Sequence, residues 1–297
     1  HHQIFIVEMG AKQVGDIKEI CDLVHPTIGV VTAVGEMHLE TFGSVENVLR
    51  TKFELIDSLP ADGLGVVNLD SEPITTAKLN HPCRVVSYSV ENKVADYRAE
   101  QINYTPAQTT FAIKNGTTLR EGYSTHLVGR GNILNLLAAV AVADALQVPE
   151  AQQKRAMRQI EQIEHRLSIK RTAGGITIID DAYNSNPAGA KMALEVLRDF
   201  NTEGRKIVVT PGFVEMGDSQ YRNNKELGVN IAAAADIAIV VNRVNREAIV
   251  AGLTEAGFDA KNIVQTDSFA EASAYLATTM RAGDVILYEN DLPDSFK

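Results

Sequence analysis

ITIIDDAYNSNPAGAKMALEVLRDF (residues 176–200) contains a strand, a turn and a helix in succession, and it sets the architecture expected for the chain. The apolar run Ile176–Ile179 predicts a buried strand, and the amphipathic segment Ala188–Phe200 predicts a helix. The same unit repeats toward the C-terminus, with strands expected at Lys206–Thr210, Ile237–Val241, Asn262–Thr266 and Asp284–Tyr288, and helices at Asn223–Ala235, Asn245–Ala256 and Ser268–Met280. This rhythm predicts a doubly wound α/β domain.

The first half begins with the same rhythm and then changes. Apolar runs alternate with helical patterns, which predicts a parallel sheet covered on both faces. The expected strands are Ile4–Val7, Ile28–Val31 and Leu64–Leu69, and the helices between them are Gly15–Val24 and Val45–Leu59. From Cys83 to Leu127 shorter alternating stretches are separated by polar turns, which predicts an antiparallel meander. Its strands are expected at Arg84–Tyr88, Tyr97–Tyr104 and Thr110–Ile113.

Two helices and a basic stretch follow the meander. The helices are expected at Asn132–Leu146 and Glu150–Ile163. Around His165–Gly175 the hydrophobic pattern lapses into basic and glycine residues. We expect the domain boundary here, which divides the chain into residues 1–165 and 166–297.

The composition of the chain argues against some classes of protein. The chain has 297 residues, a net charge of −10 and no cluster of Lys and Arg, which argues against nucleic acid as a partner. No apolar run reaches the roughly 18 residues that span a bilayer. Cys21 and Cys83 are expected to be reduced thiols in the cytoplasm. The chain begins with His1-His2-Gln3 and enters an expected strand at once, so we expect it to be cut from something longer.

Glu8 and His38 follow the first two expected strands of the chain. The carboxyl ends of parallel strands gather at one edge of a sheet, so these side chains are candidates for one crevice. A carboxylate and an imidazole can hold a divalent cation. The alternative is that Glu8 caps the next segment and His38 lies on the surface. Lys52 stands in a helical segment, where the local pattern indicates a solvated lysine.

DDAYNSNP (Asp180–Pro187) follows the strand Ile176–Ile179. A carboxylate at a strand end can accept hydrogen bonds from ribose hydroxyls, and Pro187 suits the first position of a helix. A capped turn without a ligand is the alternative. Gly129–Asn132 opens the alanine-rich helix, where free amides can bind an anion and Asn132 can cap. Asn135 would lie one turn further on the same side.

Arg166 lies at the expected boundary, where an arginine can reach a phosphate with two hydrogen bonds. The alternative is a surface ion pair with a neighbouring glutamate. The segment GFVEMG (Gly212–Gly217) follows the strand Lys206–Thr210 and is a weak signal of a ligand loop. A phosphate loop of the form G-x-x-x-x-G-K-[ST] does not occur in the sequence.

Together these segments resemble the Mur ligase family, and its MurF-type members in particular, over essentially the whole chain. The matching segments are EMGAKQVGDI (Glu8–Ile17), HLETFGS (His38–Ser44), the lysine of TKFEL (Lys52), GRGNILNLLAA (Gly129–Ala139), EHR (Glu164–Arg166) and DDAYNSNP. The resemblance implies a truncated central ATPase domain of the P-loop type, with a parallel sheet and a small antiparallel part, over residues 1–165. A Rossmann-like, doubly wound C-terminal domain would follow over residues 166–297.

The resemblance also implies an activity and a ligand set. MurF-type ligases add D-alanyl-D-alanine to a UDP-linked muramoyl-tripeptide, through an acyl phosphate, in peptidoglycan synthesis in the cytoplasm. It implies ATP and Mg²⁺ as cofactors, with Glu8, His38 and a carbamate on Lys52 as catalytic residues and metal ligands. The implied nucleotide contacts are Asn132, Asn135, Arg166, Asp181, Tyr183, Asn184 and Asn186.

Two departures from the family pattern stand out. Gly131-Asn132 replaces the usual His-Asn, and GFVEMGD replaces the usual GDMxELG loop. The N-terminal substrate domain and the phosphate loop are expected upstream of His1, so the 297-residue chain alone is expected not to turn over. Two alternatives stay open: a ligase of the same family with another carboxylate and amine, and a nucleotide-binding homologue without catalysis.

Overall fold

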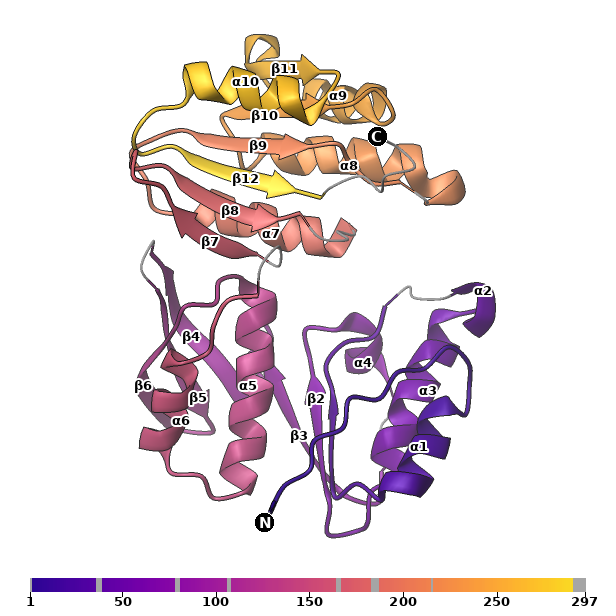
Figure 1. The fold of residues 1–297 in the computed structure, drawn as a ribbon. Coiled ribbons are helices and arrows are strands. Elements are labelled where there is room, and N and C mark those ends of the chain that lie inside the picture. Colours follow the sequence, from indigo (N-terminus) through magenta and orange to yellow (C-terminus); the bar gives the residue numbers. More distant parts are fainter. Residues whose placement is uncertain are drawn as a thin grey trace. The chain divides into compact units, whose positions relative to one another are not determined.

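The computed structural model describes residues 2–35, 39–77, 81–105, 108–163, 167–182, 187–214 and 216–290, and at Leu39 and Glu40 it describes the backbone alone. Two compact units make up the fold, and each has its own sheet (Figure 1). The first unit comprises His1–Ile102, Phe111–Tyr123 and Asn132–Met157. The second comprises Asn103–Thr110, Ser124–Gly131 and Arg158–Lys297.

The sheet that begins in the first unit has the strand order β1-β2-β3-β4-β5-β6. Its strands are β1 (Ile28–Val31), β2 (Leu64–Asn68), β3 (Arg84–Ser89), β4 (Tyr97–Tyr104), β5 (Thr109–Asn115) and β6 (Thr118–Thr125). The helices of this half are α1 (Asp16–Val24), α2 (Leu39–Phe42), α3 (Val45–Asp57), α4 (Glu72–Thr76), α5 (Arg130–Ala145) and α6 (Glu150–Arg158). Strands β1, β2 and β3 pair in parallel, whereas the two-residue turn between β5 and β6 can join only antiparallel strands.

Helix α3 positions Lys52 and shows how the local sequence builds this unit. The Ser44 hydroxyl caps the helix by accepting a hydrogen bond from the Asn47 N–H at 3.3 Å. The apolar face of α3 buries Val48, Phe53 and Ile56 in a core shared with β1 and β2. Lys52 is therefore presented from a helix whose orientation is set by packing.

Two expectations for this half are wrong. Ile4–Val7 is not a strand: the segment is irregular, and Phe5 and Ile6 are 82% and 88% exposed. An apolar, β-branched run becomes a strand only where a partner strand is available, and none of the described residues pairs with it. Arg84–Tyr88, expected in the meander, is β3 and pairs in parallel with β2.

The first residues of β4 also lie parallel to β3, through the pair Tyr88↔Tyr97. A parallel connection this short is unusual, because most need a dozen residues or more. Here the Asp70 carboxylate organises the turn by accepting hydrogen bonds from the Ser89 hydroxyl and from the Val90 N–H, the latter at 2.9 Å. The alternation of side chains predicts strands but does not indicate whether two neighbouring strands run parallel or antiparallel.

The sheet of the second unit has the order β11-β10-β9-β12-β8-β7. Its strands are β7 (Ser168–Arg171), β8 (Thr177–Asp181), β9 (Lys206–Thr210), β10 (Ile237–Val241), β11 (Ile263–Thr266) and β12 (Val285–Glu289). All neighbours pair in parallel except β7, which is antiparallel to β8. Strand β7 lies in the stretch that was expected to be irregular, and it forms because β8 offers it a free edge.

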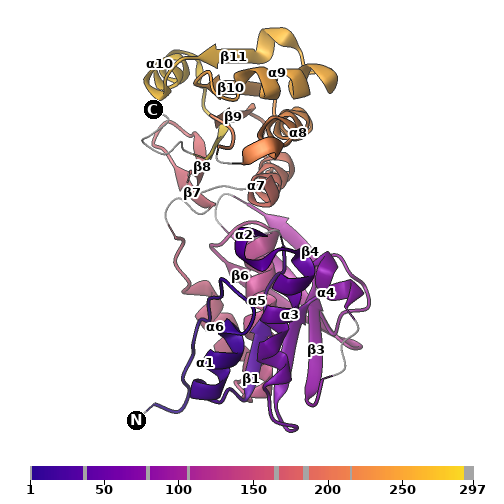
Figure 2. The ribbon, with the colours of Figure 1, turned by 90° about the vertical axis from the view of Figure 1, so that its right-hand side faces the viewer.

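Helices cover both faces of this sheet. They are α7 (Pro187–Asp199), α8 (Gln220–Ala232), α9 (Arg246–Glu255) and α10 (Phe269–Thr279), with short 3₁₀ turns η1 (Gly217–Ser219) and η2 (Ala260–Asn262). Helices α7, α8 and α9 pack on one face and α10 on the other (Figure 2). This is the expected doubly wound arrangement, so the predicted α/β fold class is confirmed. None of the helices in the described part of the chain is long and apolar enough to cross a membrane.

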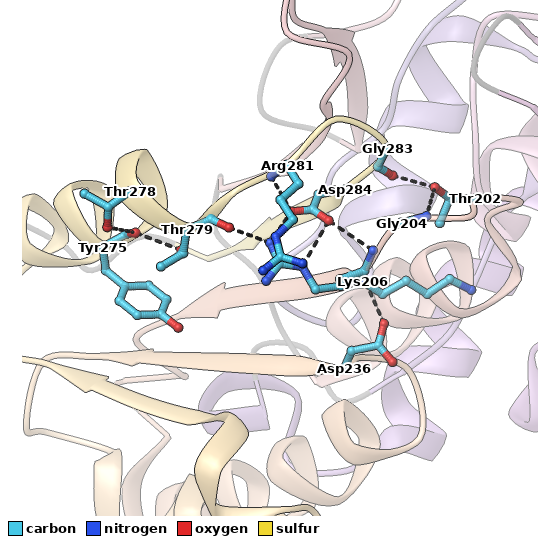
Figure 3. A network of polar contacts seen from close by, with 11 residues as sticks. Thr202, Gly204, Lys206, Asp236, Tyr275, Thr278, Thr279, Arg281, Gly283 and Asp284 are labelled. Atoms are coloured by element: carbon cyan, nitrogen blue, oxygen red, sulfur yellow. Dashed lines mark hydrogen bonds and ion pairs between the residues drawn. The ribbon is translucent and has the colours of Figure 1, made fainter.

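The amino end of this sheet is closed by a charged pair (Figure 3). Asp284 is 1% exposed and accepts hydrogen bonds from the Arg205 guanidinium at 2.6 Å and from the Arg281 N–H at 2.8 Å. Burial alone would raise the pKa of Asp284, but these hydrogen bonds lower it below its ordinary value. The strands are packed so closely here that a Cβ on Gly204 would lie 2.2 Å from the backbone of Gly283.

Candidate functional site

The predicted metal site is only partly within the described residues. Glu8 is exposed in an irregular segment, not at a strand end, and His38 lies outside the described residues. The segment after Glu8 is held in place by the Thr41 hydroxyl, which donates a hydrogen bond to the Lys12 carbonyl. Thr41 stands three residues after His38. Lys12 and Thr41, which belong to the two predicted metal-binding segments, are therefore neighbours in the fold.

Lys52 lies half-buried on α3, beside the fully buried Thr51. Burial lowers the pKa of its ammonium group. A lower pKa increases the share of neutral amine, which is the form that reacts with CO₂ to give a carbamate. The surroundings of Lys52 are thus compatible with the modification that the resemblance implies.

The fit to a metal depends on the donor atoms. The exposed carboxylate of Glu8 and a carbamate oxygen on Lys52 would both be hard oxygen donors of the kind that Mg²⁺ prefers. Within the ranges that the structure describes, no group of three or more His, Cys, Asp and Glu side chains could hold a metal ion.

Asp181 brings three of the predicted nucleotide segments together. It is the last residue of β8, and its Oδ1 accepts a hydrogen bond from the Leu167 N–H at 2.9 Å. Leu167 has a left-handed backbone with φ 54, and its side chain lies over Gly129, where a Cβ would be 2.4 Å from the Leu167 Cδ2. The turn before α5, the residue after Arg166 and the end of β8 thus meet at Leu167.

The electrostatics of Asp181 are unusual for an aspartate. Burial raises its pKa to about 6, and the neighbouring Asp180 adds to the rise, while hydrogen bonds with the Leu167 N–H and the Glu289 side chain act in the opposite direction. Arg and Lys residues of the described ranges form no ion pair with Asp181. The Asp181 carboxyl therefore holds its proton to a higher pH than an ordinary aspartate.

Glu289 is a residue of this site that sequence reasoning missed. It pairs in register with Asp181, as the last residue of β12, and it is 0% exposed. The only signal in the sequence was its position at the end of the last expected strand, at the edge where ligands bind in such sheets. Its closeness to Asp181 depends on β12 inserting between β8 and β9, which no local pattern indicates.

Asn132 and Asn135 lie on α5 as expected, but Asn132 is not the N-cap. The helix begins at Arg130, directly after Gly129 with φ 88, so Asn132 lies in the first turn. Asn132 is half-buried and Asn135 is exposed. The expected cap was wrong because the left-handed Gly129 starts the helix earlier than the asparagine would.

The other predicted nucleotide contacts fall outside the described residues. They are Arg166, Tyr183, Asn184 and Asn186. Pro187 is the first residue of α7, as expected from its fixed φ.

Comparisons with known proteins agree with the two-part architecture. Residues 1–143 match the Mur ligase middle domain, and residues 165–288 match the family described as Mur ligase, glutamate ligase domain. The solved MurF ligase from Thermotoga maritima in complex with ADP superposes with a TM-score of 0.76 and 23% identity, covering 95% of this chain and 62% of that one. At this identity the likeness concerns the fold.

Curated relatives carry two different activities in their names. The UDP-N-acetylmuramoyl-tripeptide--D-alanyl-D-alanine ligase of Bacillus subtilis is 26% identical over 230 residues, which cover 77% of this chain and 49% of the relative. The UDP-N-acetylmuramate--L-alanine ligase of Sorangium cellulosum is 30% identical over 275 residues, which cover 88% and 57%. The chain spans about half the length of these relatives. With both of its halves matched by Mur ligase domains, the chain belongs to the Mur ligase family.

Proposed function

We propose that this chain is the central and C-terminal part of a MurF-type ligase, an ATP-dependent enzyme of peptidoglycan precursor synthesis. The enzyme would join D-alanyl-D-alanine, or a similar amine, to a UDP-linked muramoyl-tripeptide in the cytoplasm. The observation that carries this proposal is the meeting of Gly129, Leu167 and Asp181 at one place. They belong to, or directly follow, three separate segments of the resemblance, so their convergence supports one nucleotide site.

The side chains of this site have separable tasks. Asp181 would accept hydrogen bonds from ribose hydroxyls, with Asn132, Asn135 and Arg166 at other parts of the nucleotide. Tyr183, Asn184 and Asn186 would line the adenosine. Glu8, His38 and the Lys52 carbamate would hold Mg²⁺, which supplies charge neutralisation where the phosphates and the substrate carboxylate approach each other.

The reaction needs positioning more than a protein nucleophile. An oxygen of the substrate carboxylate attacks the γ-phosphorus of ATP, and ADP leaves. The amine nitrogen then attacks the carbonyl carbon of the acyl phosphate, orthophosphate leaves, and the amine loses a proton. The chain's own residues orient the reactants and exclude water, which is sufficient for phosphoryl transfer in many enzymes.

The test is phosphate release by the protein expressed with the sequence that precedes His1, in the presence of ATP, Mg²⁺ and a panel of amino acids and dipeptides. We expect release that depends on D-alanyl-D-alanine and the UDP-linked tripeptide. Lys52→Ala should lower the rate about 1,000-fold, because a metal ligand is lost, and added bicarbonate should not restore it. Wild-type rates in this variant would remove Lys52 from the site.

A second candidate function is favoured by a specific observation. A relative named as an L-alanine ligase is 30% identical over 88% of this chain, whereas the relatives named as D-alanyl-D-alanine ligases are 26% identical over 77% of it and 28% identical over 95%. A Mur-family ligase with another carboxylate and amine is therefore the alternative, and the same panel separates it. Nucleotide binding without turnover on any acceptor would instead indicate a non-catalytic homologue.

A further inference from the structure

The loop Pro211–Phe213, after β9, is fully buried, although it lies at the ligand edge of the sheet. The Gly212 N–H donates to the Thr210 hydroxyl at 3.0 Å. The Phe213 N–H donates to the Asn224 Oδ1 at 2.8 Å, and the Phe213 carbonyl accepts from the Asn224 Nδ2 at 2.9 Å. Asn224 itself is 0% exposed. Both amides of the loop are therefore engaged by neighbouring side chains.

The remaining carbonyls of this loop are engaged by two more asparagines. The Pro211 carbonyl accepts from the Asn245 Nδ2 at 3.0 Å, and the Gly212 carbonyl accepts from the Asn290 Nδ2 at 2.7 Å. Because proline has no N–H, these bonds account for every backbone polar group of the three residues. These three residues therefore have no free amide to offer a phosphate, and we call them the strut.

Asn290 connects this strut to the backbone of Asp181. It directly follows β12 and has a left-handed backbone with φ 63. Its N–H donates to the Asp181 carbonyl at 3.2 Å, while its side chain holds the Gly212 carbonyl on the other side of β12. A non-glycine residue in this conformation costs about 1 kcal/mol or more, and such residues cluster at functional sites.

Asn242 has the same left-handed backbone conformation as Asn290 but forms different hydrogen bonds. It directly follows β10 at the same edge of the same sheet, and its φ is 67. Its N–H donates to the Thr266 carbonyl at 2.9 Å, and its Oδ1 accepts from the N–H groups of Arg243 and Val244. These bonds organise its own turn and the neighbouring strand end. Asn242 is thus a matched control for Asn290.

We propose that Asn290 is a positioning residue of the nucleotide site, which fixes the end of β8 against the strut Pro211–Phe213 and so sets where the Asp181 carboxylate lies. This inference rests on the proposed function for the role of Asp181. Without the Asn290 side chain, the Gly212 carbonyl would lose its partner, and the ends of β8 and β9 would no longer be tied across β12. Asp181 would then sample positions that bind ribose less well.

The test compares Asn290→Gly and Asn290→Asp with Asn242→Gly in the protein that includes the sequence upstream of His1. Glycine accepts the left-handed backbone and removes the side chain, whereas aspartate tolerates that backbone but replaces the donor with an oxygen. The measurement is the dissociation constant of ADP with Mg²⁺ by calorimetry, with the melting temperature of each variant. We expect both Asn290 variants to bind ADP at least fivefold more weakly, and Asn242→Gly to stay within twofold of wild type.

A structural role alone would lower the melting temperatures without separating the two positions. Equal ADP affinities in Asn290→Gly and Asn242→Gly, or wild-type affinity in Asn290→Asp, would overturn the proposal. Phosphate release is measured in the same proteins. If the wild-type protein binds ADP but ligates no acceptor, the proposed ligase activity is wrong and the Asn290 comparison still stands. If the wild-type protein binds no ADP, both proposals are wrong.

Discussion

The second unit's sheet has a buried aspartate at its amino end and another at its carboxyl end, and the pKa values of the two are shifted in opposite directions. At the amino end, Asp284 is neutralised by Arg205, and its pKa lies below the ordinary value. At the carboxyl end, Asp181 meets an amide and another carboxyl group, and its pKa is raised to about 6. The same sheet thus carries an acid paired with a cation at one end and, at the other, an acid that forms no ion pair within the described residues. A raised pKa of this kind is a common mark of a functional site.

The largest effect is expected at the amino end. Arg205→Ala would leave Asp284 charged and 1% exposed without its cation, and breaking such a pair typically destabilises a protein by about 3 kcal/mol or more. Urea denaturation of the variant would measure the free energy of unfolding, with ADP affinity as the second readout. We expect a large loss of stability and unchanged ADP affinity. A loss of ADP affinity in protein that remains folded would break the contrast between the two ends.

An effect of intermediate size is expected from replacing one glycine at each end of the sheet. A Cβ on Gly204, at the amino end, would lie 2.2 Å from the Gly283 backbone, and a Cβ on Gly212, at the carboxyl end, would lie 2.2 Å from the Asn224 Oδ1. Alanine at either position should cost about 2 kcal/mol of stability through overpacking. Only Gly212→Ala should also weaken ADP binding, because it displaces the strut. Equal ADP affinity in the two alanine variants would contradict this.

The smallest expected effect is the pH dependence of stability at Asp181. Its pKa is about 3.9 in an unfolded chain and about 6 in the folded state. A raised pKa stabilises the folded state below the unfolded value, and this contribution is lost as pH rises through the folded value. Stability should therefore fall between about pH 4 and pH 6, and Asp181→Asn should flatten that fall. An identical pH profile in wild type and variant would show that Asp181 does not titrate as proposed.

Much of the fold followed from local patterns. The strands Lys206–Thr210 and Ile237–Val241 have the predicted bounds, because continuous β-branched runs between helices have few alternative structures. The exposed segment Ile4–Val7 has an equally strong pattern and forms no strand. A strong apolar pattern therefore shows that a segment favours the strand conformation. Whether the strand forms depends on a neighbouring strand, about which the segment's own sequence says nothing.

Some residues of the candidate site could likewise be predicted from the sequence, and others could not. Asp181 was recognisable because a carboxylate follows a strand within DDAYNSNP. Glu289 and Asn290 were not, since nothing in the residues around them indicates which strand will lie beside β12. Lys52 illustrates the reverse case, because its helical surroundings suggested a solvated side chain and burial in the folded unit lowers its pKa.

What could be read from the order of residues was the alternation of strands and helices, the family to which it belongs, and the carboxylate at the end of β8. What required the folded chain was the set of partners around that carboxylate: the left-handed Leu167 and Asn290, the neighbouring Glu289 and the buried strut after β9. The reason is physical. Periodicity and turn chemistry act over a few residues, whereas hydrogen bonding and desolvation act between groups that only the packing of distant segments brings together.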